Sequence, residues 1–263
     1  MENTISQQEN QLIFGRLRIF NLIMGCLHAV QGVIMLMLSS DFSLSIITSF
    51  VGFNQSTQKL FTQMNTIFDV RVGPLVAGFL FLSALAHIMV SLPGIYEWYV
   101  KNLKKGANFA RWIEYAFSSS LMIVIIGLLV GVYDVMTLIL LFGLNAMMIL
   151  FGWMMELHNQ TTQKTNWTSF IFGSIAGIIP WIVVALYLFN AGDSAHKAPV
   201  FVYWIYFSIF LFFNCFAINM ILQYKKVGKW QQYLYGERVY IILSLVAKSL
   251  LAWQVWAGTL RPV

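Results

Sequence analysis

The stretch LSLVAKSLLAW, Leu243–Trp253, places a lysine near the middle of the last long apolar segment, Val239–Leu260. A charged lysine at the centre of a membrane helix costs roughly 2.5–3.5 kcal/mol on insertion scales. Lys248 therefore needs a paired anion, a water-filled cavity or covalent chemistry. Because a desolvated amine loses its proton readily, it is also a candidate for a Schiff base. A structural ion pair inside the membrane is the simpler alternative.

The composition around this stretch is that of a membrane protein. Of the 263 residues, 59% are hydrophobic and 10% are charged, and the mean hydropathy is +0.73. Soluble globular domains carry about 25% charged residues. Only helices and closed barrels satisfy their backbone polar groups in lipid, and the apolar runs here have the length of helical spans. The sequence therefore predicts an all-α membrane protein.

We expect a single domain over residues 1–263 with seven spans. A polar stretch of about 30 residues, Ser39–Arg71, separates the first two spans. Loops of this length are often functional, and its short apolar alternations could form a small β-hairpin used in dimer contact or as a lid. The spans are predicted at residues 12–38, 72–96, 108–133, 135–158, 167–190, 200–224 and 235–260.

The lysines and arginines predict the orientation, because cytoplasmic loops carry an excess of both. With the N-terminus inside, ten fall in inner segments and four in outer ones. We therefore expect a multi-pass protein of the plasma membrane, with the N-terminus cytoplasmic, the C-terminus outside and the long first loop extracellular. The net charge of +6 is spread over these short loops, so it does not indicate nucleic-acid binding. The inner residues are Arg16, Arg18, Lys101, Lys104, Lys105, Lys164, Lys225, Lys226, Lys229 and Arg238.

The natural partner for Lys248 is Glu114, several residues inside the third predicted span. An unpaired buried charge of either sign would be prohibitive, which favours an ion pair between the two. Arg111 lies at i−3 to Glu114, one turn away on the same face. The alternative for Arg111 is that its side chain extends to the lipid headgroups.

Other polar residues recur at helical spacing inside the spans, and each alone is typical of a hydrogen bond between helices. Two histidines near an amine and a carboxylate could also form a proton-accepting network. A metal site is not indicated, because no third ligand is suitably spaced and there are only two cysteines. The sequence also has no nucleophilic triad, phosphate loop or HExxH pattern, so we expect no enzyme. The polar residues are His28 with Gln31, Ser83 with His87, Ser118, Ser119, Asn145, Glu156 and Ser244.

The chain combines these features in a pattern that resembles the heliorhodopsins, which are retinal-binding relatives of the microbial rhodopsins. RWIEYAFSSSLM, Arg111–Met122, resembles their third-helix signature, and SLVAKS, Ser244–Ser249, resembles their retinal-lysine segment. The long first loop and the predicted cytoplasmic N-terminus also match, and the resemblance covers the whole chain. It implies a rhodopsin-like seven-helix bundle.

The resemblance implies roles for these residues. Lys248 would bind all-trans retinal covalently as a protonated Schiff base, and Glu114 would be the counterion that stabilises its charge. The Schiff base and proton-accepting network would comprise His28, His87, Ser244, Ser83, Gln31 and Arg111, with Glu156 in another polar network. The aromatic residues of the fifth and sixth spans would form a slot for the polyene, although helix packing explains them equally. The expected pocket is Tyr115, Ser118, Ser119, Met122, Asn145, Met148, Trp181, Tyr203, Phe207 and Phe213.

The implied activity is light sensing with transient proton transfer and no net ion transport. Proton pumps resemble one another in having a carboxylate four residues before the lysine and another eleven after the counterion. Here those positions are Ser244 and Ile125. A light-driven proton pump, a light-gated ion channel and a non-retinal membrane receptor or transporter remain the alternatives. The expected partners are retinal, membrane lipid, a second copy in a homodimer and an unidentified cytoplasmic signalling protein.

Overall fold

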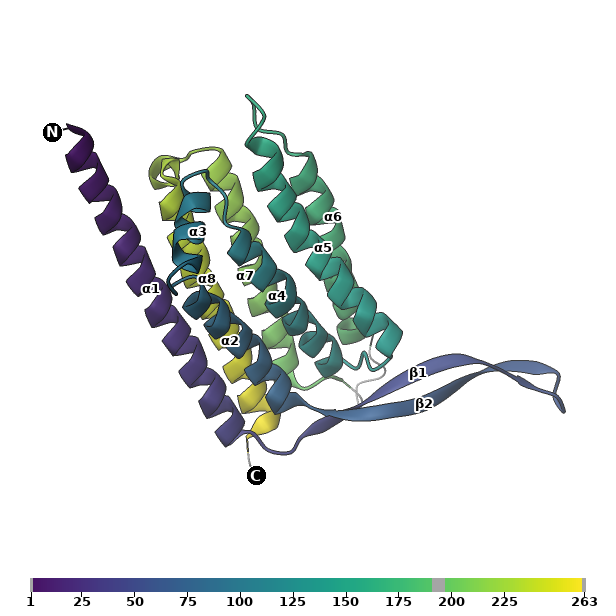
Figure 1. The fold of residues 1–263 in the computed structure, drawn as a ribbon. Coiled ribbons are helices and arrows are strands. Elements are labelled where there is room, and N and C mark those ends of the chain that lie inside the picture. Colours follow the sequence, from purple (N-terminus) through teal and green to yellow (C-terminus); the bar gives the residue numbers. More distant parts are fainter. Residues whose placement is uncertain (1, 191–196, 262–263) are drawn as a thin grey trace.

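The computed structural model describes residues 2–190 and 197–261, in which seven helices are long and apolar enough to cross a membrane (Figure 1). This confirms the predicted seven-helix bundle. A short helix α3 (Ile95–Leu103), a 3-10 turn (Gly228–Gln231) and a π-helical turn (Trp256–Leu260) accompany them. The seven long helices are α1 (Glu2–Leu38), α2 (Val72–Met89), α4 (Phe109–Leu129), α5 (Val135–Asn159), α6 (Thr168–Phe189), α7 (Val200–Tyr224) and α8 (Tyr233–Val255).

Helix α8 contacts helices from both halves of the bundle. It contacts α1 and α2 on one side and α7 on the other, while α4 contacts α2, α5, α6 and α7. The N-terminus and the C-terminal end of α8 lie at opposite ends of the bundle (Figure 1). The lysine-bearing helix and the helix that carries Glu114 are therefore both central elements.

The long first loop is a β-hairpin. Strands β1 (Ser43–Asn54) and β2 (Lys59–Arg71) pair antiparallel, with a bulge between Ile46 and Ile47. The hairpin projects sideways from the end of the bundle opposite the N-terminus (Figure 1). Ile46 is buried against Leu128 and Val132, so the base of the hairpin is fixed to the bundle while its outer half is exposed.

Two predicted span boundaries were wrong. The second span was predicted to run to residue 96, but α2 ends at Met89, because Pro93 and Gly94 follow and neither continues a helix well. Gly94 has a φ of 82°, and the separate helix α3 begins after it. The third span was predicted to reach residue 133, but α4 ends at Leu129, just before Gly131 with a φ of 99°. Positive φ values favour glycine at both turns.

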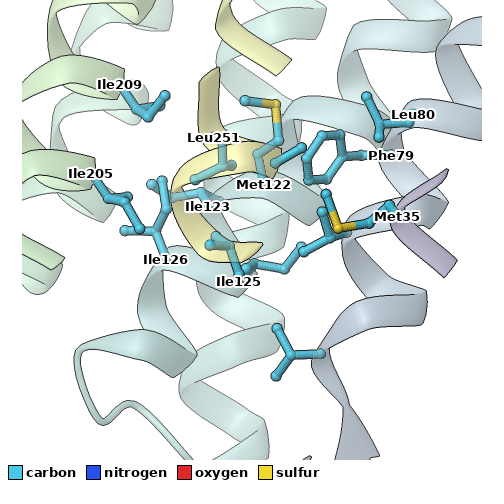
Figure 2. Close-up of a cluster of buried hydrophobic side chains, with 14 of the residues drawn as sticks. Met35, Phe79, Leu80, Met122, Ile123, Ile125, Ile126, Ile205, Ile209 and Leu251 are labelled. Carbon is cyan, nitrogen blue, oxygen red and sulfur yellow. The ribbon is translucent and has the colours of Figure 1, made fainter. Parts of the chain in front are cut away.

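The core differs between the two ends of the bundle. Toward the end that carries the hairpin, the described side chains of α1, α2, α4, α6, α7 and α8 form an apolar cluster (Figure 2). Along α4 this cluster follows Glu114, and along α8 it follows Lys248. The polar clusters lie toward the other end. The labelled members are Met35, Phe79, Leu80, Met122, Ile123, Ile125, Ile126, Ile205, Ile209 and Leu251.

Asp134 links the hairpin to the start of α5. Its carboxylate accepts the Thr137 backbone N–H at 3.0 Å and the Ser49 hydroxyl at 3.2 Å. The hydrogen bond from the Thr137 N–H holds the pKa of Asp134 below its usual value. A depressed folded-state pKa means that the stabilisation is present at neutral pH and is lost as the pH falls through that pKa.

We therefore expect Asp134→Ala to lower the free energy of unfolding by about 1 kcal/mol, the typical value for a helix cap. Asp134→Asn retains the cap and is the matched control. Thermal unfolding in detergent measures both. The difference in stability between the native protein and Asp134→Asn should become smaller as the pH falls. A difference that grows at low pH would contradict this assignment.

Candidate functional site: a buried lysine–carboxylate pair

Lys248 and Glu114 form a buried ion pair. The Lys248 Nζ lies 2.7 Å from the Glu114 Oε1, and the two side chains are 4% and 7% exposed. The Ser244 hydroxyl, one turn earlier on α8, lies 2.9 Å from the same Nζ. The pairing predicted from the sequence is therefore present. Removing either partner would leave an uncompensated buried charge, so the two residues constrain each other.

A second helix supports Glu114. The Ser83 hydroxyl of α2 donates to the Glu114 Oε1 at 2.7 Å. The Lys248 Nζ also lies 5.1 Å from the centre of the Tyr115 ring, within cation–π range. The Tyr115 hydroxyl in turn donates to the Tyr240 carbonyl at 2.9 Å, which ties α4 to α8. Three helices thus fix the geometry of the pair.

The two predicted histidines lie together beside this pair. The His28 and His87 rings stack with centroids 5.8 Å apart. His87 Nδ1 lies 2.8 Å from the Asn21 Oδ1, which can only accept, so this nitrogen carries a proton. Both nitrogens of His28 are buried and have no hydrogen-bond partner among the described residues. Sequence reasoning missed Asn21, whose position about two turns before His28 on the same helix face was the available signal.

Two members of the predicted network lie elsewhere. Gln31 accepts the Trp253 indole N–H at 3.1 Å and makes no contact with Glu114 or Lys248 among the described hydrogen bonds. Arg111 was expected either to join Glu114 or to extend to the headgroups, and both expectations were wrong. Its guanidinium binds two other carboxylates, those of Glu156 at 2.5 Å and of Glu237.

These three residues form a second buried site, which we call the arginine cluster: Arg111, Glu156 and Glu237. Asn108 donates its backbone N–H to Glu156 at 2.9 Å and its side-chain amide to Glu237 at 2.7 Å. Arg111 belongs here because α4 turns its long side chain toward the N-terminal end of the helix, where these carboxylates lie. The prediction of a separate polar network at Glu156 agrees with this placement.

Sequence analysis missed Glu237. Its signal was the spacing of Glu237, Ile241, Ser244 and Lys248, which repeats every three to four residues and marks one face of α8. Glu237 and Tyr240 are buried at 0% and 2% exposure. The same face of α8 thus carries the lysine of one site and a carboxylate of the other.

Two cavities meet beside Lys248. The smaller, about 50 Å³, touches Lys248 and Ser244, and the larger, about 400 Å³, extends between α5, α6 and α7. Both are bordered by Tyr115, Met148 and Phe213, among others. Of the predicted pocket residues, Tyr115, Ser118, Ser119, Met122, Met148 and Phe213 line the smaller cavity and Trp181 lines the larger one.

Three predicted pocket residues do not line these cavities. The Tyr203 hydroxyl lies 3.4 Å from the Leu188 carbonyl, and its ring packs on Phe189. Phe207 is 55% exposed on the outside of α7. These two predictions were wrong, because an aromatic-rich helix presents rings on all sides and the sequence does not show which side faces inward. Asn145 is buried between α4 and α5, where its amide donates to Ser119 at 2.8 Å.

The lining of the two cavities fits retinal. A long apolar group needs an aromatic slot, and an aldehyde needs an amine at the end of that slot; Trp181, Phe213 and Lys248 supply these features. Met148 and Tyr115 border both spaces, so the two cavities are neighbours. Within residues 2–190 and 197–261, no group of three or more His, Cys, Asp or Glu side chains could hold a metal ion.

We expect Arg111→Met to lower the free energy of unfolding by about 3–5 kcal/mol, because it leaves the buried acidic cluster without its cation. Arg16→Met, at an exposed position of α1, is the control and should change stability little. Thermal unfolding in detergent compares them. Equal melting temperatures for the two variants would contradict the structural role of the arginine cluster.

Comparison with known proteins agrees with this geometry. The chain matches the family model named Heliorhodopsin over residues 17–260. No curated protein matches it. Members of this family are generally not classical enzymes, and the family implies a retinal chromophore. The match spans nearly all of the bundle, from α1 to the π-helical turn that follows α8. This chain therefore belongs to the heliorhodopsin family and is a multi-pass, retinal-binding, rhodopsin-type photoactive membrane protein.

Proposed function

We propose that this protein is a light-sensing photoreceptor that carries all-trans retinal on Lys248 as a protonated Schiff base. The observation that carries the proposal is the buried Lys248–Glu114 pair, with its Nζ to Oε1 distance of 2.7 Å, at the edge of an aromatic cavity. When bound, retinal supplies the light-absorbing polyene, whose isomerisation changes the surroundings of the lysine nitrogen.

The residues around that nitrogen have distinct tasks. Glu114 is the counterion, and its carboxylate stabilises a positive charge on the nitrogen of Lys248. Ser83 holds the Glu114 Oε1 from α2, and Ser244 holds the nitrogen from α8. Both hydroxyls can donate and accept, so they can keep a hydrogen bond when the proton moves.

The histidine pair is a second group beside the lysine that can take up a proton. His87 already uses Nδ1 toward Asn21, which leaves its Nε2 as an acceptor. A cavity of about 40 Å³ touches both His87 and Glu114, and it is large enough for a bridging water. We therefore assign His87, with His28 stacked on it, to transient proton acceptance.

The distribution of polar groups supports a sensor that moves no net ion. A pump needs groups that accept and release protons on both sides of the lysine. Toward the hairpin end, the described core beside Lys248 and Glu114 is formed by residues such as Ile125, Ile126 and Val255, all fully buried. These aliphatic side chains provide no hydrogen-bonding groups for a proton. Neither a pump nor a channel is therefore favoured.

The remaining assignments form part of the same proposal. The chain is a single domain over residues 1–263 in the plasma membrane, with its N-terminus in the cytoplasm. The exposed apolar side chains of the hairpin, among them Phe53, Leu60 and Met64, support a homodimer contact. Two basic segments form the surface to which a cytoplasmic signalling partner would bind. They contain Lys101, Lys104, Lys105, Lys225, Lys226 and Lys229.

The proposal predicts a coloured protein. Expression with all-trans retinal should give a visible absorption band that hydroxylamine bleaches under illumination. Lys248→Ala should abolish the band because it removes the only amine at the cavity edge among the described residues, whereas Lys101→Ala, at an exposed position, should keep it.

A band that persists in Lys248→Ala would refute the attachment site, and no band in the native protein would favour the non-retinal receptor or transporter. Illumination of cells that contain the coloured protein distinguishes the remaining alternatives. We expect no sustained pH change or current. A sustained pH change would indicate a pump, and a current that follows the membrane potential would indicate a channel.

The counterion role predicts the pH dependence of the colour. In Glu114→Gln the negative charge beside the nitrogen is lost, so the visible band should disappear at a pH lower by about 1–3 units than in the native protein. Absorbance titration in the dark measures the midpoint, and Glu97→Gln, at an exposed position, is the control. An unchanged midpoint in Glu114→Gln would contradict the assignment.

A further inference from the structure

The arginine cluster has one more acid than base. Arg111, Glu156 and Glu237 are 7%, 3% and 0% exposed. The other buried cation among the described residues, Lys248, is paired with Glu114. If both carboxyl groups of the cluster were ionised, one negative charge would be buried without compensation, and such a charge is strongly unfavourable. A single bound proton would make the cluster neutral.

The two carboxyl groups of the cluster differ in their hydrogen bonds. Glu156 accepts four donors: the Arg111 guanidinium, the Tyr233 hydroxyl, the Trp112 indole N–H and the Asn108 backbone N–H. These four donors hold the Glu156 carboxyl group in a fixed position beside the Arg111 guanidinium.

Glu237 has a weaker set of donors. It accepts only two, from Arg111 and from the Asn108 side chain, among the described residues. Both carboxyl groups bind the same guanidinium, so one extra proton can be shared between them.

The cluster also has unused hydrogen-bonding groups. The Arg111 Nε and the Tyr240 hydroxyl are buried without a partner among the described residues, and the Arg111 guanidinium lies 4.0 Å from the Tyr240 ring centre. The cavity of about 40 Å³ beside Arg111 and Asn108 also touches Glu114. A site of this size and polarity holds water, so water can bridge the cluster to the Lys248–Glu114 pair.

The other side of the cluster faces a larger polar space. Glu156 and Tyr233 line a cavity of about 290 Å³, which we call the vestibule, between the ends of α5, α7 and α8. Its other lining residues are mostly amides and hydroxyls, with Lys226 as a cation. The cluster thus separates an outer polar cavity from an inner one. The other titratable side chains around it are Tyr99, Tyr115, Tyr224, Tyr233, Tyr240 and His87.

We propose that the arginine cluster is a proton reservoir for the buried Lys248–Glu114 site. It holds one extra proton at neutral pH, shared by the Glu156 and Glu237 carboxyl groups. The stored proton passes from the cluster through water in the small cavity to the Glu114 carboxylate. A proton from vestibule water then replaces it in the cluster by way of Glu156 and Tyr233. The stored proton needs no retinal, so this inference goes beyond the proposed function and can fail separately from it.

Infrared spectroscopy of the full-length protein purified without retinal tests the stored proton. The native protein at neutral pH should show a C=O stretch of a protonated carboxyl group that shifts in D₂O. Either Glu237→Gln or Glu156→Gln should remove it, because one arginine then faces one carboxylate. Glu114→Gln and Glu97→Gln are the controls and should retain the stretch.

Absence of the stretch in the native protein would overturn the proposal, as would its persistence in either cluster variant. Because both variants are expected to give the same result, failure of one to fold leaves the other as the test. Tyr233→Phe tests the route from the vestibule: it should slow deuteration of the carboxyl group relative to Tyr235→Phe. Equal deuteration rates in Tyr233→Phe and Tyr235→Phe would overturn the proposed route for protons from the vestibule.

Discussion

The buried contact between the Lys248 amine and the Glu114 carboxylate is the constraint on which the rest of the structure depends. Neither charge is tolerable alone in an apolar bundle, so α4 and α8 must lie close enough to bring the two groups within 2.7 Å. Ser83 then positions α2 against the same carboxylate. The central helices are therefore arranged around one ion pair, and the aromatic cavity opens beside it.

The bundle has a polar end and an apolar end, and this asymmetry shapes its chemistry. Toward the N-terminal end, the histidine pair, the small cavity, the arginine cluster and the vestibule provide successive hydrogen-bonding groups. Toward the hairpin end, aliphatic side chains such as Ile125 and Val255 fill the core. The ionisable groups to which a proton could move from the central pair therefore lie mainly toward the N-terminal end. This asymmetry supports the proposal of a sensor without net transport.

Much of this could be predicted from the sequence, and the failures have physical reasons. The length and hydropathy of the runs fix the spans, and the cost of a buried charge links Lys248 to Glu114. The predicted placement of Arg111 beside Glu114 was wrong, because helical spacing gives the face on which a residue lies but not the direction or reach of its side chain. The predicted pocket positions of Tyr203 and Phe207 were wrong, because aromatic rings are common both on lipid-facing surfaces and in helix-bundle cores. Glu237 was missed because its position near the start of the span resembles an interfacial acid.

The central claim is that Lys248 carries the chromophore beside Glu114. The most direct measurement is to reduce the retinal-loaded protein with borohydride, digest it and map the retinyl-bearing peptide by mass spectrometry. The account predicts the added mass on Lys248, within the peptide that also contains Ser244 and Ser249. Retinyl mass on any other lysine, or none on the Lys248 peptide of a coloured protein, would contradict it.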